Sequence, residues 1–216
     1  MEILYEDRDI TVVLKPAGLV SEQTASGDGF ADLLAARNPN RYVGVVHRLD
    51  RGVSGVMVYA RTPKAAAGLS RAVQERSFGK EYLAVVHGVP AQPEDTLCDL
   101  LFHDRQKNKT FVVARERNGV KPASLSYRLL GTVEHPVYGE ISLVRIVLHT
   151  GRTHQIRVQF SSRGMPLVGD GKYGARDRCE IALFCASISF PHPVTRKLMT
   201  FSKMPESEIF AFENVP

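Results

Sequence analysis

The sequence is poor in cysteine and has no long apolar run. Its three cysteines are widely spaced, and none belongs to a C-x-x-C pair. Scattered cysteines of this kind are typical of core thiols in a reducing compartment. No apolar stretch approaches the ~20 residues that a helix needs to cross a bilayer. Charged residues also interrupt every apolar run of the N-terminal segment MEILYEDRDITVVLKP, which argues against a signal or transit peptide. We therefore expect a cytoplasmic protein.

The sequence also lacks the common motifs of metal and nucleotide sites. Its seven histidines form no H-E-x-x-H pattern, so we expect no metal site. The segment GDGKYG, residues 169–174, fits G-x-G-x-x-G but lacks the preceding strand, the following helix and the later acidic residue of a dinucleotide site, so we predict a tight turn. The H-R-L-D at residues 47–50 resembles the kinase H-R-D, but the sequence contains no D-F-G, and it has no G-x-S-x-G for a serine hydrolase.

Length and charge limit the architecture and the partner. With 216 residues, 44% of them hydrophobic, the chain can bury a substantial core without disulfides or metals. No repeat or low-complexity linker divides it, so we predict one compact domain over residues 1–216, within which two lobes are allowed. Lysine and arginine total 28 against 23 acidic residues. The net charge of +5 favours a polyanionic partner, although an ordinary basic enzyme fits it equally well.

Strands outnumber helices in the predicted pattern. One amphipathic helix begins after an N-cap at Thr62 and runs to a stop at Gly79, a shorter one runs from an N-cap at Thr153 through Ser162, and a third covers residues 31–37. Apolar runs predict strands at residues 10–14, 43–46, 56–59, 80–87, 111–114, 124–130, 142–149, 181–190 and 197–201. Because strands and helices do not alternate strictly, we predict an α+β fold with a mostly antiparallel sheet rather than a doubly wound parallel sheet.

Two segments carry more polar side chains than a packed fold explains. The first, HRLDRGVSG at residues 47–55, places Asp50 on a loop between two apolar strands, and loops on rigid scaffolds are common sites of chemistry. The second, HTGRTHQIRVQ at residues 149–159, begins a helix with four polar side chains, Arg152, His154, Gln155 and Arg157. Burying so many donors is costly unless they bind something, and a helix N-terminus suits a phosphate or carboxylate. Arg157 is also a candidate cationic partner for a buried aspartate.

Several motifs together resemble the RluA family of RNA pseudouridine synthases. HRLD-x-x-x-SG is followed in order by K-x-Y, GRTHQIR and G-x-P-L-V-GD-x-x-YG, and the resemblance runs from K-P-A-G-L at residues 15–19 to the strand near Phe201. It implies the pseudouridine synthase fold, an α+β fold in which helices and loops flank a mostly antiparallel mixed sheet with a central active-site cleft. Because the chain starts directly at the K-P-A-G-L strand, we expect no separate N-terminal S4-type RNA-binding domain.

The resemblance implies roles for individual residues. It identifies Asp50 as the catalytic carboxylate, Tyr82 as an aromatic side chain that stacks on the base and hydrogen-bonds it, and Arg157 as the arginine that pairs with Asp50. Arg48 matches an arginine that can occupy the space vacated by the target base. Further substrate contacts are expected from His47, Arg152, His154 and Gln155.

The sequence departs from the family pattern at two places. Val53 stands where a threonine is usual, which removes a hydroxyl from the loop of Asp50, and Phe184-Cys185 stands where Leu-His is common. We expect neither change to abolish activity.

The implied reaction needs no cofactor. Turning uridine into pseudouridine breaks the C1′–N1 bond, rotates the uracil and joins C1′ to C5, with no redox change and no outside group. One carboxylate, kept ionised by a nearby arginine, can act as the nucleophile or as the base. Attack of Asp50 on C1′, attack on C6 and an elimination that starts at C2′ are all compatible with the sequence.

The expected partner is transfer RNA, ribosomal RNA or both, bound by a monomer through phosphate contacts. A basic stretch suited to those contacts contains Arg105, Lys107, Lys109, Arg115, Arg117 and Lys121. A solvated surface explains that stretch equally well. Two other functions stay open, a non-catalytic RNA-binding or folding factor with the same fold and a hydrolase that uses an aspartate nucleophile to release uracil.

Overall fold

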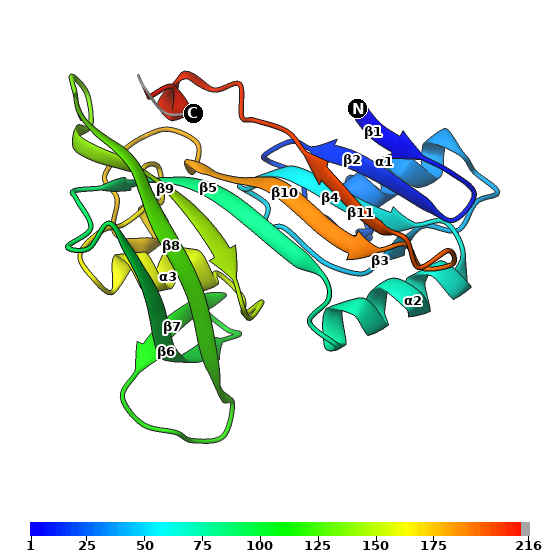
Figure 1. Cartoon of the computed structure of the whole chain (residues 1–216), viewed down its shortest axis with the longest axis horizontal. Helices are drawn as coiled ribbons and strands as arrows, with labels where there is room; N and C mark the ends of the chain where they lie inside the picture. The colour runs from blue at the N-terminus through cyan, green and yellow to red at the C-terminus, as the bar shows by residue number, and fades with distance from the viewer. Residues whose placement is uncertain (213–216) are drawn as a thin grey trace. The chain divides into compact units, whose positions relative to one another are not determined.

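A computed structural model describes residues 1–212 of the chain, and Figure 1 shows its elements. The backbone forms two compact units. Unit 1 contains residues 1–81 and 184–205, and unit 2 contains residues 82–183 and the segment from residue 206 onward. The assignment of residues 1–216 to one domain stays a prediction. Within residues 1–212, no helix has the length and apolar character needed to cross a bilayer.

The strands of unit 1 form one sheet. They are β1 (Glu2–Glu6), β2 (Ile10–Lys15), β3 (Gly44–Val45), β4 (Ser54–Ala60), β11 (Leu198–Ser202) and, apart from its first residue, β10 (Leu183–Pro191). Their order is β1-β2-β4-β10-β11, and β3 pairs with β4. β4 and β10 run parallel, whereas the other pairs in this unit are antiparallel.

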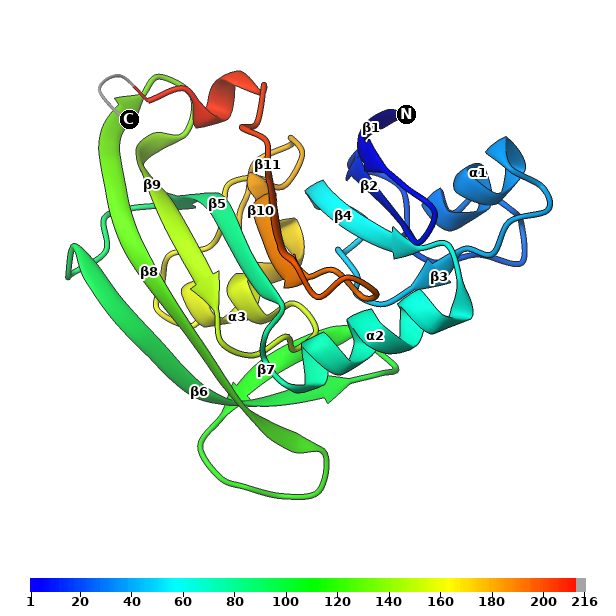
Figure 2. The ribbon, with the colours of Figure 1, turned by 45° about the vertical axis from the view of Figure 1, so that its right-hand side comes forward.

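Two helices flank this sheet (Figure 2). The first, α1 (Phe30–Arg37), buries Phe30, whose ring lies 6.0 Å from the ring of Tyr59 in β4. The second, α2 (Pro63–Gln74), has the predicted N-cap, because the Thr62 hydroxyl accepts a hydrogen bond from a backbone N–H of the first turn. The apolar stripe of α2 faces the core, as its spacing predicts.

Unit 2 is built on long antiparallel strands. Its elements are most of β5 (Gly79–His87), β6 (Glu94–Asp104), β7 (Lys109–Val113), β8 (Val120–His135), β9 (Gly139–Leu148), α3 (Gln155–Ser161) and the short 3-10 turns η1 (Gly171–Tyr173) and η2 (Glu208–Phe210). The strand order is β5-β9-β8-β6-β7. The pairs β6–β7, β6–β8 and β8–β9 are antiparallel.

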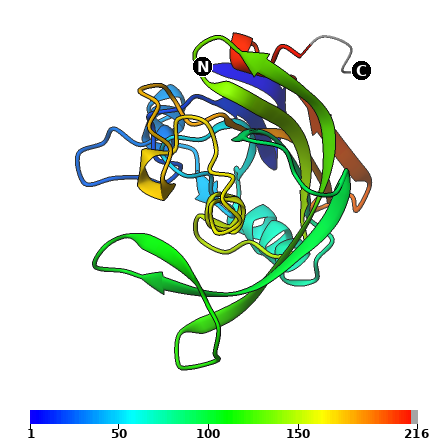
Figure 3. The same cartoon turned by 90° about the vertical axis from the view of Figure 1, so that its left-hand side faces the viewer.

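The long strands of unit 2 curve around α3, which Figure 3 shows end-on. Ile156 and Phe160 are buried, as predicted from their helical spacing. The Phe160 ring packs edge-on against Tyr127 of β8, with 5.5 Å between the ring centroids. This packing fixes the helix that carries Arg157.

The predicted α+β class with a mostly antiparallel sheet is confirmed. The tight turn predicted for GDGKYG is present as η1, flanked by Gly169 at φ 79° and Gly174 at φ 109°. Both glycines adopt the left-handed conformation that the turn requires.

Two predictions of element boundaries were wrong. The helix that begins after Thr62 ends at Gln74 rather than near Gly79, because Arg76 adopts φ 59° and Gly79 already starts β5. The helix predicted to be capped by Thr153 starts at Gln155, after His154 in the left-handed conformation. Strands β1 and β6 were not predicted.

Candidate active site

The loop that carries Asp50 connects β3 to β4. The pairing of Val45 with Tyr59 holds the β3 end of the loop, and the pairing of Gly55 with Lys15 of β2 holds the β4 end. Inside the loop, the backbone N–H of Val53 donates to the carbonyl of Asp50 at 3.0 Å and closes a turn. Asp50 itself is partly exposed. The loop therefore presents a carboxylate from a backbone that is held at both ends, as the sequence predicted.

Gly55 sets how β4 leaves this loop. Its φ is +134°, and a Cβ built on it would lie 2.4 Å from both the backbone N and the backbone O of Cys185 in β10. No side chain fits at that separation, and φ in this range favours glycine. The glycine of the Ser-Gly pair in the motif is thus explained by the close approach of the parallel strands β4 and β10.

A buried serine clamps the residue before Asp50. The Oγ of Ser21 accepts a hydrogen bond from Leu49 N at 3.0 Å and donates one to Leu49 O at 2.8 Å. The Ser21 carbonyl in turn accepts from the Tyr59 hydroxyl at 2.9 Å. Burial raises the pKa of Tyr59, which keeps that hydroxyl a donor. A segment far earlier in the chain therefore holds the backbone beside the catalytic candidate.

A buried lysine lies beneath the same loop. Lys15 is 0% exposed, and its Nζ donates to the carbonyls of Pro16 and Leu19, each at 2.7 Å. Burial lowers the pKa of Lys15 to about 8, and the negative charges of Asp50 and Glu22 oppose that shift. The K-P-A-G-L segment also binds the loop directly, because Gly18 N donates to Arg51 O at 2.8 Å. This buried positive charge beside the Asp50 loop was not predicted.

His47 is enclosed by the protein. It is 6% exposed, and its Nε2 accepts from Val58 N at 3.1 Å, so the neutral ring carries its proton on Nδ1. Burial, followed by the charge of Lys80, holds the pKa of His47 well below its usual value. Its ring packs on Phe78 with 4.9 Å between the centroids. These contacts position the loop, and a direct contact between His47 and substrate stays a prediction.

Two further loop residues have contrasting surroundings. Arg48 is exposed and forms an ion pair with Glu22, with Nη1 and Oε1 2.6 Å apart. Val53, which replaces the family threonine, is 2% exposed. The departure therefore places methyl groups, not a hydroxyl, in a buried position of the loop.

The start of α3 is held by Gln155. Its Oε1 accepts from Thr150 Oγ1 at 2.8 Å and from Arg152 N at 3.0 Å, while its Nε2 donates to Ser124 O at 3.1 Å. Arg152 is partly exposed, and its Nε donates to Pro122 O at 3.0 Å. Gln155 thus satisfies backbone groups ahead of the helix, whereas the sequence predicted an N-cap at Thr153.

Arg157 is bound by Asp170. Its Nε donates to Oδ2 at 2.7 Å and its Nη2 to Oδ1 at 2.8 Å, in a two-pronged ion pair that is almost fully buried. The guanidinium lies 5.1 Å from the centroid of the Tyr173 ring. The hydroxyl of Tyr173 also contacts His154 Nδ1 at 2.9 Å. The turn GDGKYG, predicted only as a turn, therefore supplies the residues that orient Arg157 and His154.

The three predicted catalytic residues come from both units. Asp50 belongs to unit 1, whereas Tyr82 and Arg157 belong to unit 2. Tyr82 lies in β5 and is 5% exposed. The pairing of Arg157 with Asp50 stays a prediction, as do the catalytic roles of all three.

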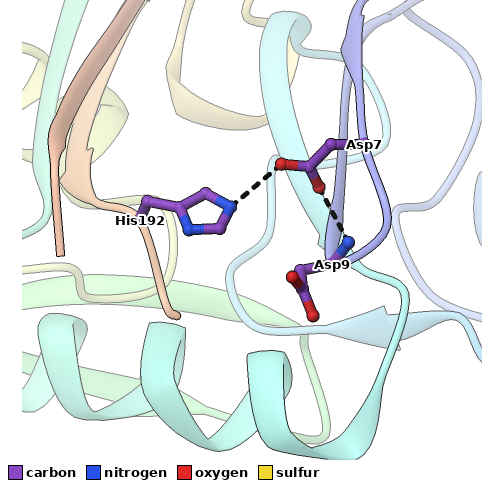
Figure 4. A group of neighbouring side chains, drawn as sticks. All are labelled: Asp7, Asp9 and His192. Atoms are coloured by element: carbon purple, nitrogen blue, oxygen red, sulfur yellow. Dashed lines mark hydrogen bonds and ion pairs between the residues drawn. The ribbon is translucent and has the colours of Figure 1, made fainter. Parts of the chain in front are cut away.

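One cluster has the donor types of a metal site. Asp7, Asp9 and His192 place their ligand atoms within 4.8 Å of one another (Figure 4). Both nitrogens of His192 are already engaged, because Nε2 lies 3.0 Å from Asp7 Oδ2 and Nδ1 accepts from the backbone N–H of Val194 and Thr195. The Asp7 carboxylate also accepts from Asp9 N and Ile10 N. These hydrogen bonds explain why the side chains lie together, because they connect the turn between β1 and β2 to the turn between β10 and β11.

Three residues important to the geometry were missed in the sequence. Lys15 and Asp170 lie inside motifs that carried the family resemblance, so the motifs themselves held the signal. Ser21 lies outside those motifs. A small polar residue in a loop gives no indication of burial, and Ser21 could not be found without the fold.

Comparisons with known proteins cover most of the chain. A family model described as RNA pseudouridylate synthase matches residues 9–162. An uncharacterised RNA pseudouridine synthase of Bacillus subtilis is 31% identical over 229 residues, which span 100% of this chain and 73% of that protein. The ribosomal large subunit pseudouridine synthase D of Zymomonas mobilis is 31% identical over 235 residues, 99% of this chain and 72% of that protein. The solved structure of human RNA Pseudouridylate Synthase Domain Containing 1 shares the fold, with a TM-score of 0.81 at 24% identity over 97% of this chain and 86% of that chain.

Proposed function

Because the chain belongs to the RNA pseudouridylate synthase family, we propose that it isomerises uridine to pseudouridine in RNA with Asp50 as its catalytic carboxylate. Membership confirms the family predicted from the motifs and the predicted enzyme class, an isomerase. The observation that carries the assignment of Asp50 is its place on a loop clamped by Ser21, Lys15 and the close approach at Gly55.

The reaction balances within the nucleotide. The C1′–N1 bond breaks and a C1′–C5 bond forms, while C5 loses its hydrogen to solvent and N1 gains a proton. Asp50 acts as the nucleophile or as the base that removes a proton. No electron acceptor or donor enters the balance.

Two residues of unit 2 are proposed to act with Asp50. Tyr82 offers an aromatic face to the freed uracil, and stacking of a base on such a ring is worth about 1–3 kcal/mol. Arg157 is proposed to pair with the Asp50 carboxylate and favour its charged form. The two-pronged bond from Arg157 to Asp170 supports this role, because it fixes the guanidinium in one orientation.

The remaining predicted residues divide by exposure. Arg48 and Arg152 are proposed to contact RNA directly, and Arg48 to fill the space left when the target uridine leaves its stack, a step that costs a few kcal/mol. His47, His154 and Gln155 make the internal contacts described above. We propose that these three residues affect the substrate indirectly, because they hold the Asp50 loop and the start of α3 in position.

Ribosomal RNA is the first substrate to test, with transfer RNA as the alternative. A relative that this chain matches over most of its length is named a ribosomal large subunit pseudouridine synthase. We also propose that the enzyme works in the cytoplasm as a monomer without a metal. Size-exclusion chromatography with light scattering tests the monomer.

The experiment is a nucleoside analysis of modified RNA. Purified wild-type protein is incubated with unmodified ribosomal RNA and transfer RNA, each RNA is digested, and uridine, pseudouridine and free uracil are separated. We expect pseudouridine with wild type, none with Asp50→Asn, and unchanged product with Asp95→Asn, an exposed carboxylate on β6. RNA that is bound but unmodified would favour the non-catalytic RNA-binding factor, and release of uracil would favour the hydrolase.

A further inference from the structure

Unit 1 contains a polar pocket, formed beside the loop that leads from α1 to β3. It is a shallow hollow with about 20 Å³ of enclosed space, and its walls include Glu6, Arg37, Arg41, Tyr42, Tyr59 and Arg61. None of these residues belongs to the motifs that carry the family resemblance. No residue of the Asp50 loop lines the pocket, and Tyr59 is the member of this set that was described above, through its hydrogen bond to Ser21.

The pocket has an excess of positive charge. Glu6 is shared by two arginines, with its Oε2 3.0 Å from Arg37 Nη1 and its Oε1 3.2 Å from Arg61 Nη1. Arg41 is exposed, and its guanidinium has no hydrogen bond or ion pair among residues 1–212. The pocket wall thus contains three arginines and one carboxylate. An anionic ligand would balance this charge, and Arg41 has its donors available for phosphate oxygens.

An exposed aromatic ring lies next to that free arginine in the sequence. Tyr42 is 44% exposed, and its hydroxyl has no hydrogen-bond partner in the part of the chain that the structure describes. The ring packs over Gly44, where a Cβ would come within 2.6 Å of the Tyr42 Cε1. Gly44 therefore lets the ring lie close to the backbone. A supported aromatic ring beside a cation is the combination on which single-stranded nucleic acids stack.

A solvated charged surface is the plainer explanation, and one observation counts against it. Arg37 and Arg61 are held in place by Glu6, so part of the site is organised before any ligand arrives. The amide of Asn38, which also lines the pocket and makes no hydrogen bond within residues 1–212, adds a further donor and acceptor beside Arg41 and Tyr42.

We propose that this pocket binds one nucleotide of the RNA substrate other than the target uridine, with its phosphate on Arg41 and its base on Tyr42. The proposal rests on the proposed function for the identity of the ligand as RNA. Tyr59 forms one wall and hydrogen-bonds Ser21, which clamps Leu49 beside Asp50. The nucleotide would anchor RNA on the unit that carries the catalytic carboxylate.

Binding of RNA by matched variants tests the proposal. Arg41→Gln and Tyr42→Leu remove the two groups separately, Tyr42→Phe keeps the ring, and Arg71→Gln on the exposed side of α2 controls for loss of one charge. We expect Arg41→Gln to lower the slope of log K against log salt by about one. Tyr42→Leu should raise the Kd for single-stranded RNA about fivefold or more with little change in slope, while Tyr42→Phe and Arg71→Gln stay near wild type.

Photocrosslinking gives a readout that does not depend on affinity. RNA containing 4-thiouridine is irradiated with the protein, and the crosslinked peptide is identified by mass spectrometry. A crosslink within residues 38–43 that is lost in Tyr42→Leu would support the pocket. Unchanged Kd and salt slope in Arg41→Gln and Tyr42→Leu, together with no crosslink in this segment, would overturn it.

Pseudouridine formation and RNA binding, measured side by side, distinguish failure of the pocket assignment from failure of the proposed function. If wild type forms pseudouridine while Arg41→Gln and Tyr42→Leu bind RNA normally, the pocket assignment fails and the proposed function stands. If RNA binding falls as expected but wild type forms no pseudouridine, the proposed function fails and the pocket stands. Uridine 5′-monophosphate shares the chemistry of an RNA nucleotide, so it is tested by thermal shift. Stabilisation by this nucleotide that Tyr42→Leu abolishes, without any change in RNA affinity, would overturn the assignment to RNA.

Discussion

At the scale of single residues, the surroundings of Asp50 combine charge, hydrogen bonding and close packing. Lys15 brings a buried ammonium beneath the loop, Ser21 binds both backbone groups of Leu49, and Gly55 admits β10 at a distance that no side chain tolerates. Each acts on the loop rather than on the substrate. Substitutions at these positions should therefore change stability as well as rate.

Lys15 predicts a pH dependence of stability. The ordinary pKa of a lysine is 10.5 and that of Lys15 in the folded protein is about 8, so the unfolded chain binds the proton more tightly. Relative to Lys15→Met, wild type should therefore gain stability as pH rises from about 8 to 10.5, by about 3 kcal/mol in all, with a flat difference below pH 8. Urea unfolding at several pH values measures this, with Lys64→Met on α2 as the exposed control. A difference that stays constant up to pH 10.5 would contradict the assignment.

Gly55 predicts a large steric effect. Alanine at this position would place its Cβ 2.4 Å from backbone atoms of Cys185 and would hold φ at +134°. We expect Gly55→Ala to lower the free energy of unfolding by about 3 kcal/mol or more, from overpacking and backbone strain together. Gly151→Ala is the matched control, because nothing lies within 4 Å of the added Cβ. Similar unfolding midpoints for the two variants would show that β10 does not approach as described.

At the scale of elements, the turn between β1 and β2 is joined to the turn between β10 and β11. Asp7 accepts hydrogen bonds from His192, Tyr5 and the backbone of Asp9 and Ile10. Burial alone would raise the pKa of Asp7, but these hydrogen bonds outweigh it and lower the pKa below 3.8. The connection holds two edge hairpins of the unit 1 sheet together.

The sign of that shift gives a prediction. A carboxyl whose pKa is lower in the folded state stabilises the protein above its unfolded pKa, and the contribution disappears as pH falls through the folded value. Asp7→Asn should therefore cost about 1–3 kcal/mol near neutral pH, and the cost should shrink below about pH 4. Denaturant unfolding between pH 3 and 7 measures it. Asp9→Asn should have a smaller effect, because no hydrogen bond to the Asp9 carboxylate occurs within residues 1–212. Equal costs for both variants would contradict the account.

The sequence predicted the elements that obey simple periodicity and missed those set by contacts. β2, β4 and β10 were predicted because they are apolar runs buried in the sheet. β6 was missed because acidic residues interrupt its apolar positions, and its pairing with β8 and β7 decides its conformation. The N-terminus of α3 was misplaced because Gln155, and not a residue before the helix, satisfies the preceding backbone.

The sequence likewise predicted only part of the candidate site. Asp50 on its loop followed from the two flanking apolar runs, and both were found as strands. The bond from Arg157 to Asp170 did not follow from periodicity, because a turn brings the two residues together. Polar residues such as His154 and Gln155 looked available for ligand in the sequence, whereas the fold uses them internally.

At the scale of the whole molecule, the net charge of +5 and the family together predict salt-sensitive RNA binding. Arg115 and Lys121 lie in the basic stretch near the strands β7 and β8, and both are exposed. We expect the double variant Arg115→Gln, Lys121→Gln to reduce the slope of log K against log salt by up to about two, without altering sequence preference. Filter binding of ribosomal RNA at several salt concentrations measures it. An unchanged slope would identify the stretch as a solvated surface.

We propose that Asp50 drives an isomerisation in which uridine C5 exchanges its hydrogen for a bond to C1′. Release of tritium from ribosomal RNA labelled at uridine C5 measures that event directly under single turnover. Wild type should release tritium in proportion to the pseudouridine formed, while Asp50→Asn, folded and able to bind RNA, should release none above background. Tritium release by Asp50→Asn at the wild-type rate, or pseudouridine formation without tritium release, would contradict the account.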